Sequence, residues 1–148
     1  MLKRILIIED NAEQREMLRE VLTYFDFLVT ALPDGRDMFS QIAAFNPDLL
    51  LIDYILPGDN GVELCLKLKK DYRTSEIPVI LMSAYLGILE HFSCCSDILC
   101  KPFDLEAILS KINNLLQVRE IHAAVSEEYF LAHLPVSAPI DFITDENQ

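Results

Sequence analysis

The sequence lacks a hydrophobic run long enough to cross a membrane. A helix that spans a bilayer needs ~18 or more consecutive apolar residues. The longest runs here, residues 5–8 and 49–52, have only the length of a β-strand. The first run also ends at Glu9, which makes it too short for the apolar region of a secretory signal. We therefore expect a cytoplasmic protein with no membrane segment.

Positive charge is scarce. The 148 residues include only 12 Lys and Arg against 24 Asp and Glu, which gives a formal net charge of −12. A protein this acidic repels polyanions, so we expect no direct DNA binding. Hydrophobic residues make up 51% of the chain, which is sufficient for one domain of ordinary size with its own core.

A Cys-x-x-Cys motif is also missing. The four cysteines are Cys65, Cys94, Cys95 and Cys100, and two of them are adjacent. Because no pair has the spacing of zinc ligands and no export signal precedes them, we expect free thiols rather than a zinc site or disulfides.

What the sequence does contain is an alternation of short apolar runs and helical patterns. Asn11 is placed to cap the first helix, with Gln14 three residues on as in a capping box, and Asp104 is placed to cap the last. The expected strands are residues 4–8, 27–31, 48–52, 78–82 and 97–100, and the helices between them include residues 62–72 and 86–92. Strands that alternate with helices predict an α/β fold with a mainly parallel sheet and helices on both faces.

The pattern weakens after residue 118. Residues 119–148 hold a single Arg against six Asp and Glu, and they are interrupted by Pro135 and Pro139. We expect the last helix to continue to about Ala124 and the remainder to be an acidic, partly disordered extension. The expected division is therefore a domain over residues 1–118 and an extension over 119–148, which is too short and too acidic for a DNA-reading output domain.

Acidic residues follow two of the expected strands. Glu9 and Asp10 come after the first strand, and Asp53 comes after the third. In an open parallel sheet the carboxyl ends of the strands share one edge, where ligands bind. Three carboxylates that meet there repel one another unless a cation relieves them. Mg²⁺ suits this role because it accepts a partial protein cage and keeps several waters.

The remaining strand ends carry groups that suit phosphoryl transfer. A carboxylate beside Mg²⁺ can act as a nucleophile toward phosphorus and form an acyl phosphate. The phosphoryl oxygens then need further cations and donors. Lys101 would supply an ammonium group, Ser83 a hydroxyl, and Ala84 a backbone N–H with little side chain in the way.

Taken together, these motifs resemble the receiver domain of bacterial two-component response regulators, over residues 3 to about 118. The matching motifs are Glu9-Asp10, Asp53-Tyr54-Ile55-Leu56-Pro57 with Gly61, Ser83-Ala84, and Lys101-Pro102-Phe103. The resemblance implies a flavodoxin-like, doubly wound, five-stranded parallel sheet with strand order 2-1-3-4-5. It also implies a signalling module rather than an enzyme, although such a module assists its own phosphorylation and dephosphorylation.

The resemblance also implies a role for each residue. Asp53 would be the phosphoacceptor for a sensor histidine kinase or a phosphotransfer protein, and the phosphorylated domain would act on a downstream protein partner. Lys101, Ser83 and Ala84 would bind the phosphoryl group and carry the switch. The implied Mg²⁺ ligands are Asp10, Asp53, the backbone carbonyl of Ile55 and, mostly through water, Glu9.

Two departures from the family pattern leave an alternative open. Ile98 stands three residues before the lysine, where the family usually has the Tyr or Phe of its switch. The interval from Ser83 to Lys101 is also shorter than usual by roughly one helical turn. A pseudo-receiver, which keeps the fold but signals without phosphate, is the alternative that these departures favour.

Two other classes fit less well. A phosphohydrolase with an aspartyl nucleophile, of the haloacid dehalogenase type, needs a second Asp two residues after the first, and this chain has Ile55 there. An electron carrier of the flavodoxin type needs a phosphate loop rich in Ser, Thr and Gly after the first strand, and that loop is missing.

Overall fold

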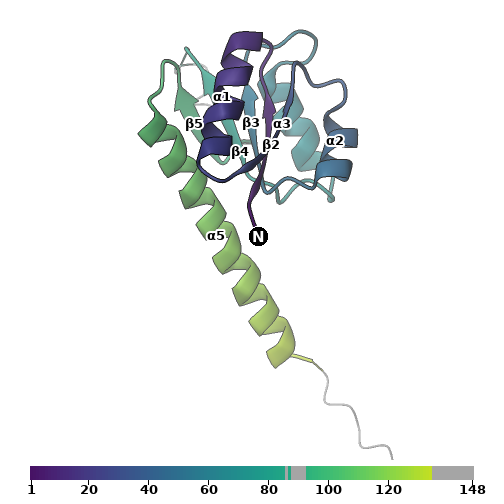
Figure 1. Cartoon of the computed structure of the whole chain (residues 1–148). Helices are drawn as coiled ribbons and strands as arrows, with labels where there is room; N and C mark the ends of the chain where they lie inside the picture. The colour runs from purple at the N-terminus through teal and green to yellow at the C-terminus, as the bar shows by residue number, and fades with distance from the viewer. Residues whose placement is uncertain (86, 88–92, 135–148) are drawn as a thin grey trace, which may run out of the picture. The chain divides into compact units, whose positions relative to one another are not determined.

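A computed structural model describes residues 1–85, 87 and 93–134 of the chain (Figure 1). Five parallel strands form one sheet in the order β2-β1-β3-β4-β5. The predicted α/β fold and the strand order implied by the resemblance are both confirmed. The strands are β1 (Arg4–Ile8), β2 (Leu28–Leu32), β3 (Leu49–Asp53), β4 (Val79–Ser83) and β5 (Asp97–Cys100).

The strand boundaries differ from the prediction at three places. β2, β3 and β4 each begin and end one residue later than expected, whereas β1 and β5 match. As a result, Asp53 and Ser83 are the last residues of their strands. Asp53 lies opposite Met82, and Ser83 lies opposite Cys100. Both functional candidates are therefore held by the sheet itself.

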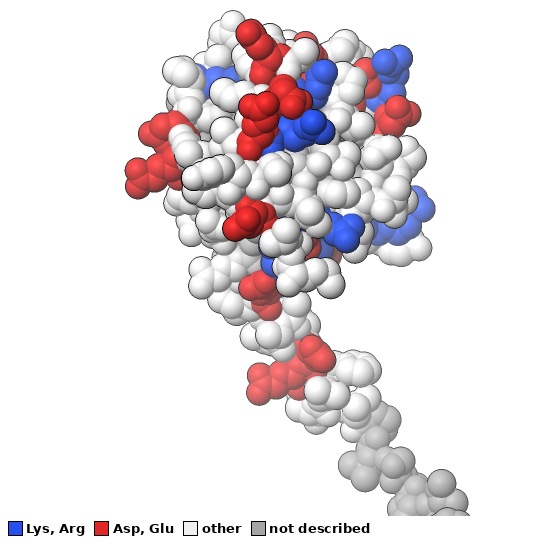
Figure 2. Space-filling view, viewed as in Figure 1, with Lys and Arg blue, Asp and Glu red and all other residues white. Residues whose placement is uncertain are grey.

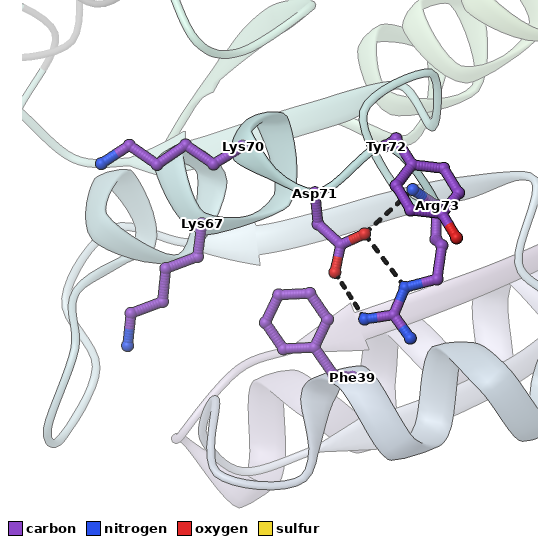
Figure 3. A pocket seen from close by; sticks show the side chains of 6 residues that line it. All are labelled: Phe39, Lys67, Lys70, Asp71, Tyr72 and Arg73. Carbon is purple, nitrogen blue, oxygen red and sulfur yellow. Dashed lines mark hydrogen bonds and ion pairs between the residues drawn. The ribbon is translucent and has the colours of Figure 1, made fainter.

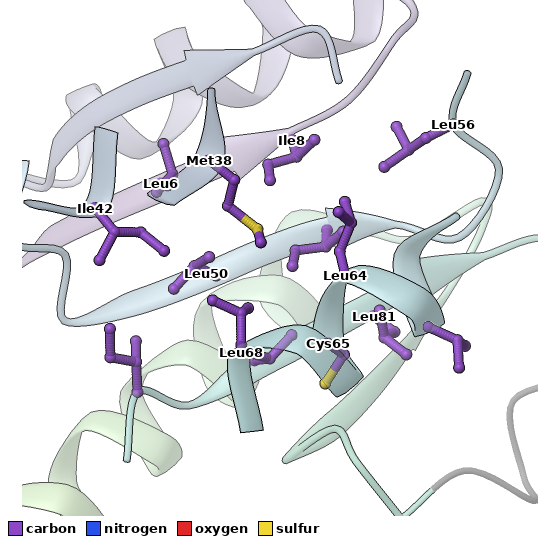
Figure 4. Packing of buried hydrophobic residues seen from close by; sticks show 14 residues of the cluster. Leu6, Ile8, Met38, Ile42, Leu50, Leu56, Leu64, Cys65, Leu68 and Leu81 are labelled. Carbon is purple, nitrogen blue, oxygen red and sulfur yellow. The ribbon is translucent and has the colours of Figure 1, made fainter. Parts of the chain in front are cut away.

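Helices cover both faces of the sheet, as predicted. Neighbouring residues of a strand point to opposite faces, so β1 sends Leu6 and Ile8 to one hydrophobic cluster and Ile5 and Ile7 to the other. The first cluster contains side chains of α2 (Met38–Phe45) and α3 (Gly61–Lys70), as Figure 4 shows. The second contains side chains of α1 (Ala12–Tyr24) and of the first turns of α5 (Leu105–Ala132).

Local sequence accounts for where three of these helices begin. The Asp104 side chain caps α5, as predicted, by accepting a hydrogen bond from the backbone N–H of Ala107 at 2.7 Å. The Asn11 side chain accepts a hydrogen bond from the backbone N–H of Gln14 at 2.9 Å, which caps α1 as predicted. Asn60 caps α3 in the same way, through the backbone N–H of Glu63. α3 ends at Lys70, two residues before the predicted end. The helix expected over residues 86–92 lies outside the described residues, apart from residue 87.

The C-terminal helix is longer than predicted. The chain divides into two compact units, Met1–Gln117 and Val118–Gln148, and α5 continues into the second one as far as Ala132. The expected end near Ala124 is wrong, because Pro135 is the first helix-breaking residue after Asp104 and the sequence between them holds no glycine. Within the described residues, none of the helices has both the length and the apolar character that a membrane span requires.

Candidate functional site

Three carboxylates meet at the carboxyl edge of the sheet, as predicted. One oxygen each of Glu9, Asp10 and Asp53 lies within 4.8 Å of the other two. Glu9 and Asp10 directly follow β1, and Asp53 ends the neighbouring strand β3. Glu9 and Asp53 are buried, whereas Asp10 is exposed. We refer to these three residues as the acidic cluster.

The backbone around the acidic cluster is fixed by hydrogen bonds. The N–H of Glu9 donates to the carbonyl of Leu32 at 3.0 Å, and the N–H of Tyr54 donates to the carbonyl of Met82 at 2.8 Å. A Cβ atom at Gly61 would stand 2.4 Å from the carbonyl oxygen of Asp53. Gly61 therefore allows the start of α3 to pack directly against the end of β3, which explains a glycine at this position.

Lys101 brings an ammonium group to the acidic cluster. Its Nζ lies 2.9 Å from Glu9 Oε2 and 3.2 Å from Asp53 Oδ2. Its backbone N–H also donates to the carbonyl of Ser83 at 2.8 Å, which holds the end of β5 against β4. The side chain is only 18% exposed. Lys101 thus joins residues that are far apart in the sequence into one site.

The electrostatic balance of the site favours a further cation. Burial raises the pKa of the Glu9 carboxyl above its ordinary value, the hydrogen bond from Lys101 opposes this effect, and the charge of Asp53 adds to it. One ammonium faces three carboxylates, so the cluster keeps excess negative charge. A donor set made only of oxygen atoms is also what Mg²⁺ prefers. The residues present therefore fit a magnesium ion.

Ser83 and Ala84 lie beside the cluster, at the end of the next strand. Ser83 is buried, and its Oγ accepts a hydrogen bond from the backbone N–H of Tyr85 at 2.9 Å. Ala84 is exposed. On the other side, the loop after β3 leaves the side chain of Ile55 57% exposed. Asp53 itself is only 7% exposed.

Ile98 lies in β5, where both its backbone and its side chain have partners. It pairs with Leu81 in the ladder between β4 and β5. Its partly buried side chain packs against the hydrophobic cluster that includes Leu81 and Cys65. The position thus carries an apolar side chain that already has its packing partners.

Two residues of α1 reach the site and were not predicted to do so. The side chain of Gln14 accepts a hydrogen bond from Lys101 Nζ at 2.9 Å. Arg15 Nη1 donates to the backbone carbonyls of Glu9 at 2.9 Å and of Asp10 at 3.3 Å. The sequence gives no local signal for the Gln14 contact, because its partner Lys101 stands 87 residues later.

The capping box proposed for α1 is only half correct. The Gln14 side chain does not return to the N–H of Asn11, because Glu9 Oε1 accepts that hydrogen at 3.2 Å. Glu9 lies before the helix, directly after β1, so the pattern of the helix alone could not predict that its side chain accepts the N–H of Asn11. Gln14 is thereby left free to bind Lys101.

A separate cleft lies away from the acidic cluster. It has a volume of about 530 Å³ and is lined by Phe39 of α2 and by residues at the end of α3 and just after it (Figure 3). Arg73 donates to Asp71 from Nε at 3.0 Å and from Nη2 at 2.7 Å, so its charge is already balanced. On the face seen in Figure 2, acidic and basic side chains are interspersed. The cleft contains no member of the acidic cluster.

The four cysteines are free thiols, as expected. Cys65 is buried, and its Sγ donates to the backbone carbonyl of Cys94 at 2.9 Å. Burial is the main reason why the pKa of the Cys65 thiol is raised far above its ordinary value.

Comparisons with known proteins agree with this site. A model of the response regulator receiver domain matches residues 5–113. The DNA-binding response regulator MtrA of Mycolicibacterium paratuberculosis is 28% identical over 148 residues, which cover 97% of this chain and 64% of MtrA. The hybrid signal transduction histidine kinase D of Dictyostelium discoideum is 29% identical over 144 residues, which cover 95% of this chain and 9% of the kinase. The chain thus spans less than two thirds of either relative.

A solved structure extends the comparison to three dimensions. Response regulator protein TrrA from Thermotoga maritima, crystallised in complex with Mg²⁺–BeF, superposes with a TM-score of 0.71 and 25% identity over 77% of this chain and 99% of TrrA. The family match covers most of the chain and includes Glu9, Asp10, Asp53, Ser83 and Lys101. This chain belongs to the family of response regulator receiver domains of two-component signalling.

Proposed function

We propose that the chain is a cytoplasmic phosphoacceptor module that takes a phosphoryl group onto Asp53 from a sensor histidine kinase or a phosphotransfer protein. The observation that carries this proposal is the position of the Asp53 carboxylate. It ends a central strand, lies 3.2 Å from the Lys101 ammonium and shares an edge with two further carboxylates. Ile55, two residues after Asp53 in the loop that follows β3, and Ala84, which follows β4, are both exposed.

The chemistry is a transfer between two nucleophiles. A carboxylate oxygen of Asp53 forms a bond to phosphorus while the phosphorus–nitrogen bond of the donor phosphohistidine breaks, and the imidazole keeps the electron pair and takes up a proton. Glu9, Asp10, Asp53 and the Ile55 carbonyl would hold Mg²⁺, which supplies positive charge to the carboxylates and the phosphoryl oxygens.

The chain's own donors complete the phosphoryl site. Lys101 has an ammonium group already directed at Asp53, which can contact a phosphoryl oxygen there. The Ser83 hydroxyl accepts the N–H of Tyr85 through its oxygen, so its own proton remains available to donate. Ala84 would offer its backbone N–H. We propose that the same groups assist loss of the phosphoryl group, without making the module an enzyme toward other substrates.

The output of the module is a change in protein contacts. A phosphoryl group adds about −1.5 to −2 charges, which draws Ser83 and Lys101 toward it and shifts the loops that carry them. Because the chain has a formal net charge of −12 and the extension after residue 118 is acidic as well, we propose a protein as the downstream partner rather than DNA. We place the signalling domain at residues 1–118 and the extension at 119–148.

One test separates this function from a pseudo-receiver. The purified chain is incubated with Mg²⁺ and acetyl phosphate, and its intact mass is measured. We expect one phosphoryl group on the wild-type protein and none on Asp53→Asn. A pseudo-receiver, which Ile98 and the short interval before Lys101 favour, would remain unmodified in both cases. Labelling of Asp53→Asn at the wild-type level would refute the choice of acceptor.

A further inference from the structure

We propose that Gln14 is a positioning residue for Lys101, holding its ammonium at the acidic cluster, and that this hold matters most when Mg²⁺ is bound. The inference rests on the proposed function, in which Lys101 contacts a phosphoryl group on Asp53. It assigns a role in the site to a neutral side chain of α1, a helix that supplies none of the residues in the motifs.

The Lys101 ammonium donates two hydrogen bonds, to Glu9 and Gln14, and forms an ion pair with Asp53. A lysine ammonium has three N–H donors. Nζ of Lys101 lies 2.9 Å from Glu9 Oε2, 2.9 Å from Gln14 Oε1 and 3.2 Å from Asp53 Oδ2. The three partners come from the end of β1, the first turn of α1 and the end of β3. Glu9 and Gln14 therefore use two of the three N–H donors, and the third remains for a phosphoryl oxygen on Asp53.

Mg²⁺ should weaken the contact of Lys101 with Glu9 but not its contact with Gln14. Glu9 belongs to the acidic cluster, so a cation bound there draws on the same carboxylate that Lys101 uses. Two cations that share one carboxylate repel each other, which weakens the contact between Lys101 and Glu9. Gln14 is neutral and lies outside the cluster, so its hydrogen bond remains. When the metal binds, the hydrogen bond to Gln14 therefore becomes the main contact that positions the Lys101 ammonium.

The start of α1 leaves the Gln14 side chain available for this role. The N–H of Asn11 is accepted by Glu9 Oε1, and the Asn11 side chain accepts the backbone N–H of Gln14. The helix is therefore capped without the Gln14 amide. Because Leu and Gln also have similar helix propensities, Gln14→Leu should remove the contact with Lys101 and leave the helix intact.

The first test compares Gln14→Leu with wild type in the full chain. Beryllofluoride serves as the phosphoryl mimic, and its binding is measured at saturating Mg²⁺, alongside the binding of Mg²⁺ alone. We expect beryllofluoride affinity to fall roughly 5-fold, the loss of one hydrogen bond, and Mg²⁺ affinity to change by less than about 2-fold. The matched control is Gln117→Leu, an exposed position on α5. Affinities for both ligands that fall together, or that both stay at the wild-type level, would overturn the inference.

The second test does not depend on the phosphoryl mimic. The side-chain ammonium of Lys101 is observed by ¹⁵N NMR, where its hydrogens exchange slowly with water only while they are held by acceptors. In Gln14→Leu we expect faster exchange, with a larger increase in the presence of Mg²⁺ than in its absence. Equal exchange in the mutant and the wild type would refute the role of Gln14. Failure of the wild type to bind beryllofluoride would instead refute the proposed function.

Discussion

The ammonium of Lys101 lies 2.9 Å from the carboxylate of Glu9, a side chain that is only 1% exposed and stands 92 residues earlier in the chain. A buried carboxylate is costly unless it is paired. Lys101 therefore acts as the internal counter-ion of the acidic cluster. A metal ion that enters the cluster meets a positive charge that is already there, so Lys101 and Mg²⁺ are linked even though they bind different groups in the proposed mechanism.

Removing the internal counter-ion should strengthen metal binding. In Lys101→Met the cluster keeps its three carboxylates and loses the ammonium that repels the incoming ion. We expect Mg²⁺ affinity to rise by at least about 5-fold, while beryllofluoride binding becomes weaker. Calorimetric titration measures both affinities. The matched control is Lys111→Met, because Lys111 pairs with Asp97 instead of with the cluster. A fall in Mg²⁺ affinity in Lys101→Met would contradict the counter-ion role.

Because Gly61 packs directly against the backbone of Asp53, a larger residue there should destabilise the fold and disturb the site. In Gly61→Ala the new Cβ would stand 2.4 Å from the Asp53 carbonyl oxygen, so β3 and α3 must move apart. Overpacking of this kind costs about 1–3 kcal/mol of the free energy of unfolding. We also expect slower labelling by acetyl phosphate, since Asp53 moves with its backbone. Urea unfolding and intact mass measure the two effects.

Gly87→Ala is the control for this substitution. Among the residues that the structure describes, no atom lies within 4 Å of a Cβ built at Gly87. We expect its free energy of unfolding to stay within about 0.5 kcal/mol of wild type. If Gly61→Ala were as stable as Gly87→Ala and were phosphorylated at the wild-type rate, the tight packing of α3 on Asp53 would not matter for the site.

The ion pair of Asp71 and Arg73 should make the stability of the fold depend on pH in the acidic range. The hydrogen bond from Arg73 lowers the pKa of the Asp71 carboxyl to about 2, from an ordinary value of 3.8. A carboxyl whose pKa is depressed in the folded state stabilises the fold above pH 3.8 and loses that contribution as the pH falls toward 2. Carboxyl ¹³C NMR should show the low midpoint for Asp71, and Arg73→Gln should bring it back toward 3.8. A midpoint that does not move would mean that the ion pair is not formed in solution.

Much of the site could be predicted because it depends on local sequence. Each candidate group stands where an apolar run ends, and parallel strands bring such ends to one edge. The exact position of Asp53 could not be read in this way. Its place as the last residue of β3 follows from its pairing with Met82 on β4, which is a contact between distant parts of the chain. Gln14 was missed for a similar reason, since its partner Lys101 comes 87 residues later.

For α5 the sequence predicts too short a helix. The weaker apolar pattern after residue 118 predicts a helix that ends near Ala124, whereas α5 continues to Ala132. Neither glycine nor proline, the two residues least favourable in a helix interior, occurs between Asp104 and Pro135, so nothing in the sequence interrupts the helix there. Val118, Ile121, Val125 and Tyr129 continue an apolar stripe at helical spacing and are all exposed. A weak apolar pattern thus marked the end of the buried part of the helix and not the end of the helix.

The effect of phosphorylation should spread only part of the way through the domain. A modification shifts an equilibrium only through contacts that differ between the two states. Ser83 and Lys101 can gain contacts with a phosphoryl group, whereas Ile98 is already packed against the hydrophobic cluster and has no polar group to exchange with water. With Mg²⁺ and beryllofluoride, we expect amide NMR shifts to be concentrated in the loops after β3 and β4 and to be small along β5.

A substitution at Ile98 tests the physical reason for that pattern. Ile98→Tyr places a large side chain with a hydroxyl where the apolar one packs, so the side chain gains two alternative positions, one buried and one reaching water. We expect the shifts over residues 96–100 to become larger in this variant, while those near Asp53 stay the same. Leu99→Met is the control, because it changes a neighbouring buried side chain without adding a polar group. Large wild-type shifts throughout residues 96–110, comparable to those at 53–60, would show that β5 switches despite Ile98.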